Sequence, residues 1–337
     1  MRTGELARIA KRRKLDQVLV FGQANIRALT GVNCDSGCLS LCASGQVAFY
    51  TDFRYVPMIH RVAPGLKVRD IRWLAARGKR IGYESTVSHA RFLSLQKLAP
   101  RAKFVDVAED LKAIRAVKTP EEQAKLRAAV ALNDEIWAAA QREFRPGMTE
   151  REMARVIRHL MIERGDGEAF DTIVCVGKNA AECHHEPDDT VWNGREPVLV
   201  DMGVRVDGFC SDMTRNLVPK RPRPLYRQIY DLVLRANAAA IAAARPGITG
   251  RALDKVARDV IREGGFGKCF GHSLGHGVGY EIHEAPTASK RDKTVLRPGM
   301  AVTIEPGVYL EDNLGVRIED LVLITETGCE VLTRSGK

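Results

Sequence analysis

A five-residue motif recurs at an interval of 100 residues in the second part of this 337-residue chain. Arg145-Pro146-Gly147-Met148-Thr149 is followed later by Arg245-Pro246-Gly247-Ile248-Thr249. In both copies the Thr precedes an amphipathic helical pattern, and its hydroxyl can cap that helix. In the first copy Thr149 and Glu152 complete a capping box. The recurrence constrains the fold strongly, because two separate segments must begin a helix in the same local structure.

Three further pairs of segments keep the same order at intervals between 98 and 107 residues. They are His185-Glu186-Pro187 with His283-Glu284-Ala285-Pro286, Val198–Asp201 with Ala301–Glu305, and Ser211-Asp212 with Ile318-Glu319. In the second pair an apolar strand ends in a carboxylate, and in the third a second strand contains one. These echoes predict a duplicated helix–hairpin unit related by a pseudo-two-fold axis. Such an axis brings equivalent strands, and therefore four carboxylates, together at the centre.

Charge divides the chain at about the same place as the local patterns do. Residues 1–120 contain 22 Lys and Arg against 9 Asp and Glu, whereas the remainder contains 30 against 33. The basic part alternates predicted strands (18–21, 46–51, 80–83) with predicted helices (6–14, 55–61, 91–98), which is typical of an α/β domain. Thr119-Pro120-Glu121-Glu122 then carries the signals of a helix start. We therefore expect two domains, residues 1–115 and 116–337.

The four carboxylates Asp201, Asp212, Glu305 and Glu319 each lie in an apolar, strand-like context. Taken alone, Asp201 is better explained as an acid at a strand end in solvent than as a ligand. Four that converge cannot all stay ionised without a cation, and paired divalent metals supply that charge. The glycine-rich segment 271–279 adds His272 and His276, and His283 follows seven residues later. Three of the eight histidines of the chain within twelve positions indicate a site.

These motifs resemble the prolidase and aminopeptidase P family, the pita-bread metallopeptidases that also include creatinase and methionine aminopeptidase. The matching segments are D-x-G at 201–203, G-F-x-S-D-x-T-R at 208–215, H-x-x-G-H-G-V-G-x-x-x-H-E-x-P at 272–286, I-E-P-G at 304–307, G-V-R-I-E-D at 315–320 and G-x-N-A-A-x-x-H at 177–184. Residues 25–31 and 51–55 are similar to the creatinase-type N-terminal domain. The resemblance implies an α/β N-terminal domain followed by a pita-bread catalytic domain with an internal pseudo-two-fold repeat.

The resemblance also implies a dinuclear site and the part that each residue plays in it. Asp201 would bind one metal, His276 with Glu305 the other, and Asp212 with Glu319 would bridge them. A hydroxide between the metals would attack the scissile carbonyl, and Glu305 would pass the proton to the leaving nitrogen of proline. The resemblance implies catalytic roles for five residues: substrate binding by His184, His272 and His283, proton transfer by Glu305, and orientation of the bridging carboxylates by Arg317. The ligand types suit Mn, Co, Fe or Zn, and the resemblance to the family favours Mn.

The chain departs from the family pattern at two positions. Cys183 replaces a proline, and His185 follows His184, so either imidazole could act; the 17-residue interval to Asp201 favours His184. Thr287 stands where prolidases tend to carry an arginine for the carboxylate of the dipeptide, although Lys290 or Arg291 could compensate. On this basis we expect an Xaa-Pro aminopeptidase, with an Xaa-Pro dipeptidase (prolidase) as the alternative.

Other classes of function fit the sequence less well. Methionine aminopeptidase lacks this N-terminal domain, and creatinase has lost the metal ligands. A catalytically inactive pita-bread binding protein is the alternative of another class, supported only by the basic N-terminal part. Lys11-Arg12-Arg13-Lys14 ends a predicted helix without interleaved aromatic residues, so it indicates a solvated face and no nucleic-acid partner. We expect short proline-containing peptides as partners, a homodimer, a cytoplasmic location and no membrane association.

Overall fold

The computed structural model describes residues 1–337, which divide into two compact units, Met1–Arg115 and Ala116–Lys337. Each unit has its own buried apolar core. No helix combines the length and the apolar character that crossing a bilayer requires. The catalytic candidates all lie in the second unit.

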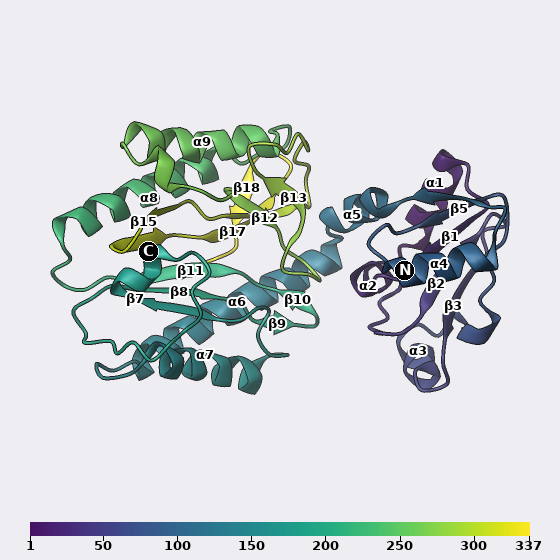
Figure 1. Cartoon of the computed structure of the whole chain (residues 1–337), viewed down its shortest axis with the longest axis horizontal. Coiled ribbons are helices and arrows are strands. Elements are labelled where there is room, and N and C mark those ends of the chain that lie inside the picture. Colours follow the sequence, from purple (N-terminus) through teal and green to yellow (C-terminus); the bar gives the residue numbers. More distant parts are fainter. The chain divides into compact units, whose positions relative to one another are not determined.

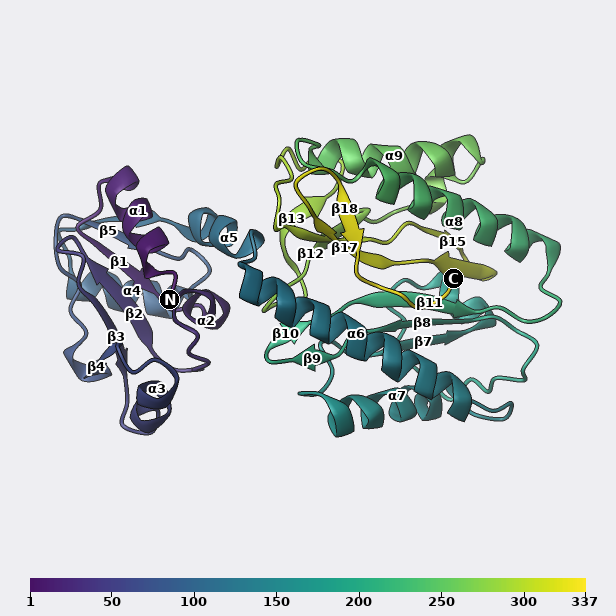
Figure 2. The same ribbon diagram turned by 180° about the vertical axis from the view of Figure 1, so that it is seen from behind.

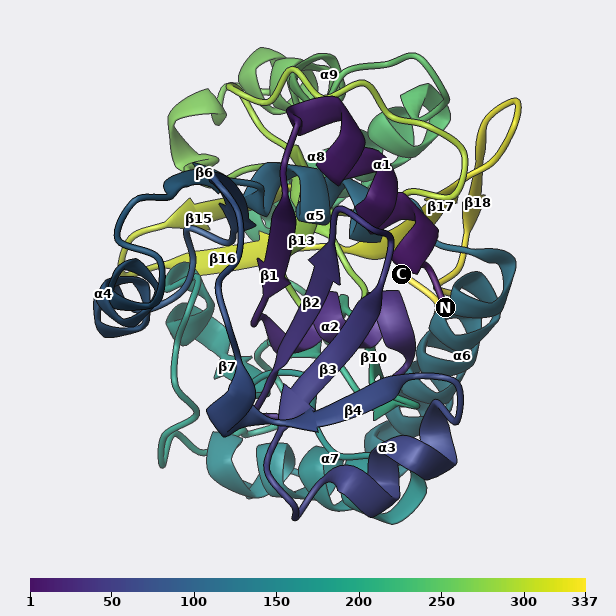
Figure 3. The same cartoon turned by 90° about the vertical axis from the view of Figure 1, so that its right-hand side faces the viewer.

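The first unit is built on a six-stranded mixed sheet with the strand order β4-β3-β2-β1-β5-β6 (Figures 1 and 3). Its strands are β1 (Gln17–Val20), β2 (Cys38–Cys42), β3 (Val47–Thr51), β4 (Lys67–Asp70), β5 (Arg80–Tyr83) and β6 (Lys103–Asp106). Its helices are α1 (Thr3–Arg13), α2 (Gln23–Thr30), α3 (Val56–Val62), α4 (His89–Leu98) and α5 (Ala108–Ala116), the last of which ends at the boundary. The predicted elements are present, and α2, β2, β4 and β6 are additional. The strands β4 and β6 are short, half-exposed and rich in charge, so they lack the apolar run that marks a strand.

The second unit contains two copies of one arrangement, a helix pair followed by a three-stranded antiparallel sheet (Figure 2). The first copy has α6 (Pro120–Glu143) and α7 (Glu150–Arg164) with the sheet β11-β8-β7, formed by β7 (Ile173–Val176), β8 (Val198–Met202) and β11 (Met213–Leu217). The second has α8 (Pro224–Ala243) and α9 (Gly250–Glu263) with the sheet β14-β17-β18, formed by β14 (Ala301–Ile304), β17 (Asp320–Ile324) and β18 (Cys329–Val331). Three short two-stranded ribbons complete the unit: β9 (Arg205–Val206) with β10 (Phe209–Cys210), β12 (Gly275–Gly277) with β13 (Glu284–Ala288), and β15 (Gly307–Leu310) with β16 (Leu314–Arg317).

The start of the second helix is built in the same way in both copies. Thr149 caps α7 and Thr249 caps α9, each hydroxyl accepting a backbone N–H three residues on. The preceding glycines match as well, since the Gly147 amide donates to Trp192 O and the Gly247 amide donates to Leu296 O. The repeated motif in the sequence therefore corresponds to a repeated structure.

Two buried asparagines tie each helix pair to its sheet at equivalent points. Asn133 of α6 donates to the carbonyl of Met202 at the end of β8, and Asn237 of α8 donates to the carbonyl of Ile304 at the end of β14. Both carbonyls belong to residues beside a predicted metal ligand. In both copies, therefore, a buried asparagine holds the backbone beside a predicted metal ligand, Asp201 in the first copy and Glu305 in the second.

Candidate metal centre

The five predicted metal ligands come from both copies of the repeat and line one cavity of about 480 Å³. They are Asp201 in β8, Asp212 just before β11, His276 in β12, Glu305 just after β14 and Glu319 just before β17. The sequence predicted that Asp212 and Glu319 lie within strands, and this was wrong by one residue in each case. The amide of Glu319 donates to the carbonyl of Thr214 on β11, so it joins the two sheets and does not extend the ladder of β17.

A glycine lets the strand that carries the histidine ligand approach its neighbour. A Cβ on Gly275 would lie 1.9 Å from the carbonyl oxygen of Thr303 in β14, a distance that no side chain tolerates. With the glycine, the amide of His276 donates to Thr303 Oγ1 over 3.0 Å, and the amide of Glu305 donates to Leu274 O over 2.8 Å. The glycine-rich segment therefore places His276 beside Glu305.

The ligand atoms lie at distances that suit a shared cation. His276 Nε2 is 3.5 Å from Asp212 Oδ2 and 3.4 Å from Glu305 Oε1. One ligand atom each from Asp212, His276 and Glu319 lies within 4.8 Å of the other two. Nδ1 of His276 lies 3.1 Å from the carbonyl of Gly277, which assigns the proton to Nδ1 and turns the lone pair of Nε2 toward the carboxylates.

The pKa shifts at the site have one physical cause, burial beside like charges. Burial first, and then the charge of Glu319, raise the pKa of Asp212 well above its usual value. Burial raises the pKa of Glu319 in the same way and that of Glu305 to about 8. Burial and the neighbouring His283 lower the pKa of His276 to about 4, so its imidazole is neutral at pH 7 and able to ligate. A carboxylate cluster of this kind needs a cation to stay ionised.

A further sign that the residues fit a metal is an oxygen without a partner. Oδ1 of Asp201 is buried and accepts no hydrogen bond, whereas Oδ2 accepts one from Arg317 over 2.6 Å. Buried carboxylate oxygens normally have a partner, and a metal would provide it here. The donor set of two Asp, two Glu and one neutral His therefore suits divalent ions.

Arg317 positions several groups of the site at once. Besides Asp201, its guanidinium donates to Thr214 Oγ1 over 3.0 Å and to Tyr309 Oη over 2.8 Å. Thr214 in turn donates to Glu319 Oε2 over 2.7 Å. Arg317 thereby fixes Asp201 directly and Glu319 through one hydroxyl.

Tyr309 is a residue of the site that sequence reasoning missed. Its hydroxyl accepts from Arg317 and lies 2.9 Å from His272 Nε2. Nδ1 of His272 is 2.8 Å from the carbonyl of Ser273, so Nε2 accepts the proton of Tyr309. Burial, and secondarily Arg317, lower the pKa of His272 to about 4, which keeps this imidazole neutral. The only sequence signal was the position of Tyr309, five residues after the start of the I-E-P-G motif.

The adjacent histidines of the loop after β7 have different surroundings. His184 is exposed in the cavity and forms no hydrogen bond, so its imidazole is available to a substrate. His185 is buried, with Nε2 2.7 Å from Glu150 Oε2 and Nδ1 3.2 Å from Glu182 Oε2. This geometry supports the choice of His184 made from the sequence.

Of the other residues that the sequence connected with substrate binding, some line the cavity and some do not. His283 lies on the cavity wall with its ring centroid 4.4 Å from that of His276. Neither Thr287 nor Lys290 nor Arg291 lines the cavity. The suggestion that Lys290 or Arg291 replaces the missing arginine stays a prediction, which this lining does not support. The amide of Thr287 bonds to Asp292, and its carbonyl packs on Gly250 of α9, so this loop turns back toward the helix.

Comparison with known proteins agrees with this geometry. Residues 124–326 match the model of metallopeptidase family M24, and residues 2–117 match that of the Creatinase/Prolidase N-terminal domain. The chain belongs to metallopeptidase family M24. It is a metallopeptidase with the creatinase-type N-terminal domain and the pita-bread fold, as the sequence predicted.

Individual relatives cover the chain from end to end. An Xaa-Pro dipeptidase of Pyrococcus furiosus is 34% identical over 342 residues, which span 100% of this chain and 98% of the relative. The crystal structure of the prolidase from Pyrococcus horikoshii OT3 superposes with a TM-score of 0.95 at 32% identity, covering 100% and 99% of the two chains. An X-Pro aminopeptidase from Thermotoga maritima superposes with a TM-score of 0.89 at 30% identity over 99% and 97%.

Proposed function

We propose that this M24 metallopeptidase is an Xaa-Pro dipeptidase that hydrolyses the bond before proline in dipeptides. The observation that carries the proposal is the convergence of Asp201, Asp212, His276, Glu305 and Glu319 on one cavity that His184 and His283 also line. The relatives named Xaa-Pro dipeptidase favour this substrate over the aminopeptidase substrate expected from Thr287. The absence of an arginine at Thr287 and the likeness to an X-Pro aminopeptidase keep longer peptides as the second candidate.

The residues of the chain have distinct parts in this reaction. Two divalent ions, for which we propose Mn, would supply Lewis-acid polarisation of the scissile carbonyl and a water of lowered pKa. Glu305 would take up a proton at a carboxylate oxygen and release it to the leaving nitrogen of proline. His184 and His283 offer unbonded imidazoles to the peptide, and Arg317 with Tyr309 keeps Asp201 and His272 in place. A homodimer and a cytoplasmic location stay predictions.

The test is a comparison of four peptides with the Mn-loaded enzyme. We expect Ala-Pro to be hydrolysed faster than Ala-Pro-Ala, and Ala-Ala and Pro-Ala to resist. A chelator should abolish the activity and added Mn should restore it. The Asp212→Ala variant should be inactive, and an unaffected Asp212→Ala enzyme would contradict the proposed site. Faster cleavage of Ala-Pro-Ala than of Ala-Pro would establish the aminopeptidase instead.

A further inference from the structure

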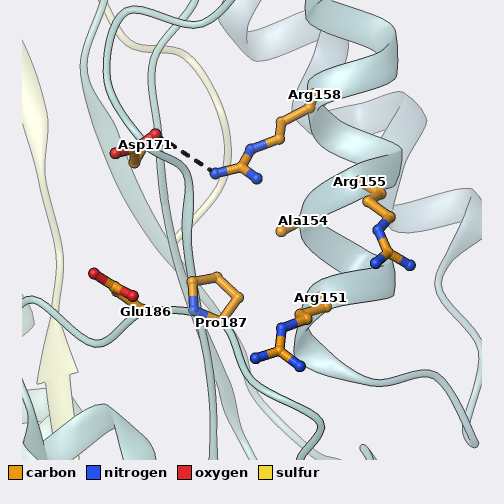
Figure 4. Close-up of a pocket in the computed structure, with 7 residues that line it drawn as sticks. All are labelled: Arg151, Ala154, Arg155, Arg158, Asp171, Glu186 and Pro187. Carbon is orange, nitrogen blue, oxygen red and sulfur yellow. Dashed lines mark ion pairs between the residues drawn. The ribbon is translucent and has the colours of Figure 1, made fainter.

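A second hollow of about 330 Å³ lies beside helix α7 (Figure 4). It shares a wall with the catalytic cavity. It is lined by Arg151, Ala154, Arg155, Arg158, Asp171, Glu186 and Pro187, which together we call the α7 groove. Asp171, Glu186 and Pro187 also line the catalytic cavity. A ligand that extends past these three residues therefore passes from one hollow into the other.

The helix side of the α7 groove is a row of arginines. Arg151, Arg155 and Arg158 are spaced by four and three residues, which puts them on one face of the helix. Ala154 between them is small and buried, so the groove reaches the helix surface. Such a row of guanidinium groups is suited to bind carboxylates, which it can contact through two N–H donors at once.

The existing partners of these arginines hold them weakly. Arg155 forms no ion pair or hydrogen bond. Arg151 pairs with Asp189, whose side chain is 81% exposed, and Arg158 reaches Asp171 over 3.7 Å, where the carboxylate is 97% exposed (Figure 4). Exposed pairs of this kind contribute little stability, so exchanging them for a ligand costs little. The shortest of these pairs joins Arg151 and Asp189 over 2.6 Å, and Arg158 also donates to Glu168, outside the groove, over 2.9 Å.

The opposite wall of the groove is held in a fixed position. Glu150, the first residue of α7, is fully buried and accepts hydrogen bonds from the amide of Asp188 and from His185, which flank Glu186 and Pro187. In the other direction, the amide of Arg151 donates to the carbonyl of Asp188. The Glu186 carboxylate extends away from α7 (Figure 4), so the wall facing the arginines presents the Pro187 ring and the exposed carboxylate of Asp171. The groove is preformed, as small-molecule sites usually are.

We propose that the α7 groove is a subsite of the peptidase that binds a carboxylate of the substrate through Arg151, Arg155 and Arg158. The proposal rests on the proposed function, because it takes the ligand of the adjoining cavity to be a peptide. The carboxylate has two possible sources, the side chain of an acidic residue before proline or an acidic residue after proline. In either case the enzyme acts preferentially on acidic peptides.

The experiment compares peptides that differ only in one charge. Glu-Pro against Gln-Pro tests the residue before proline, and Ala-Pro-Glu-amide against Ala-Pro-Gln-amide tests the residue after it. For each pair, kcat/KM is measured with the Mn-loaded enzyme. Dissociation constants are measured by calorimetry with analogues whose bond before proline is a methyleneamine and cannot be hydrolysed.

We expect the acidic member of one pair to bind about tenfold more tightly than its neutral partner, and to lose this advantage in 0.5 M salt. The double variant Arg151→Gln/Arg155→Gln should bind both members of the pair alike. Arg164→Gln, on the same helix but outside the groove, is the matched control and should keep the preference.

Equal binding of both members in both pairs, or a preference that survives the double variant, would overturn the subsite. The two proposals fail separately. Absence of any hydrolysis contradicts the peptidase function, whereas the binding constants of the analogues still decide whether the groove takes a carboxylate.

Discussion

The neighbouring side chains His184 and His185 show how one residue's surroundings decide its role. The first faces the cavity without a hydrogen bond, and the second is bonded to the fully buried Glu150. Glu150 also accepts from the amide of Val176 and from Asn179, so removing His185 leaves it partly bonded. A substitution at each position should therefore have a different effect.

We expect His184→Ala to lower kcat/KM on Ala-Pro by at least about 100-fold with an unchanged free energy of unfolding, because it removes only a group that contacts substrate. His185→Ala should instead lower the free energy of unfolding by about 1–3 kcal/mol, since a buried carboxylate loses a partner. Urea unfolding and steady-state kinetics on both variants are the measurements. A stable but inactive His185→Ala enzyme would show that the catalytic imidazole belongs to His185 and not to His184.

Arg317 acts through the groups that it positions. Arg317→Met should lower kcat/KM by about 10- to 100-fold and weaken metal binding, because Asp201 and Tyr309 lose their common donor. Metal content after dialysis, measured by mass spectrometry, separates this from a general loss of folding. Arg297→Met, at an exposed arginine whose guanidinium forms no bond, is the control and should behave as the wild type. Full metal occupancy and full activity in Arg317→Met would contradict the positioning role.

At the scale of elements, the approach of β12 to β14 is the contact on which the centre depends. It requires Gly275, because a Cβ at this position would lie 1.9 Å from Thr303 O, whereas a Cβ on Gly271 of the same segment would meet nothing within 4 Å. Both glycines belong to the same motif in the sequence. Only the structure distinguishes the one that packs from the one that does not.

Gly275→Ala should push β12 away from β14 and separate His276 from Glu305. We expect the variant to lose about 1–3 kcal/mol or more of stability and to bind metal more weakly, since the clash is with backbone that cannot rotate away. Gly271→Ala should leave both properties unchanged. Thermal unfolding with and without Mn measures the difference, and equal metal-induced shifts in the two variants would show that the close approach is not needed.

The sequence predicted the helices and the convergence of the carboxylates better than it predicted hydrogen-bond partners in the site. The helix starts at Thr119, Thr149 and Thr249 follow from local chemistry, because a cap needs only residues a few positions apart. The carboxylates were found because the repeat implied that equivalent strands meet. Tyr309 and Glu150 were missed, since their histidine partners lie 37 and 35 residues away and no local pattern indicates them.

At the scale of the whole molecule, the proposed metal centre would join the two copies of the repeat. Asp201 and Asp212 come from the first copy, and His276, Glu305 and Glu319 come from the second. The hydrogen bonds from Arg317 to Asp201 and from Thr214 to Glu319 already link the copies at this point, and a shared cation would add to them. Metal binding should therefore stabilise the second unit as a whole, by mass action on the folded state.

This coupling predicts how stability depends on pH in the metal-free protein. The raised pKa of Glu305, about 8, and the raised pKa values of Asp212 and Glu319 mean that the folded state holds protons that the unfolded state releases near pH 4. A group with a raised folded pKa stabilises below its unfolded pKa and loses that contribution as pH rises through the folded value. The lowered pKa values of His272 and His276 act in the opposite sense, but only below about pH 6.5, where unfolded histidine titrates.

Above about pH 6.5 these two histidines no longer contribute, and the raised pKa of His185 acts in the same direction as the carboxylates. We therefore expect the melting temperature of the metal-free protein to fall between about pH 6.5 and 8.5. Saturating Mn should remove the fall, because the cation keeps the carboxylates ionised, and its binding should release protons. Calorimetry in buffers of different ionisation enthalpy measures that release, and thermal unfolding measures the stability. A melting temperature that is flat with pH in the metal-free protein, together with metal binding that releases no protons, would show that these carboxylates are ionised before the metal arrives.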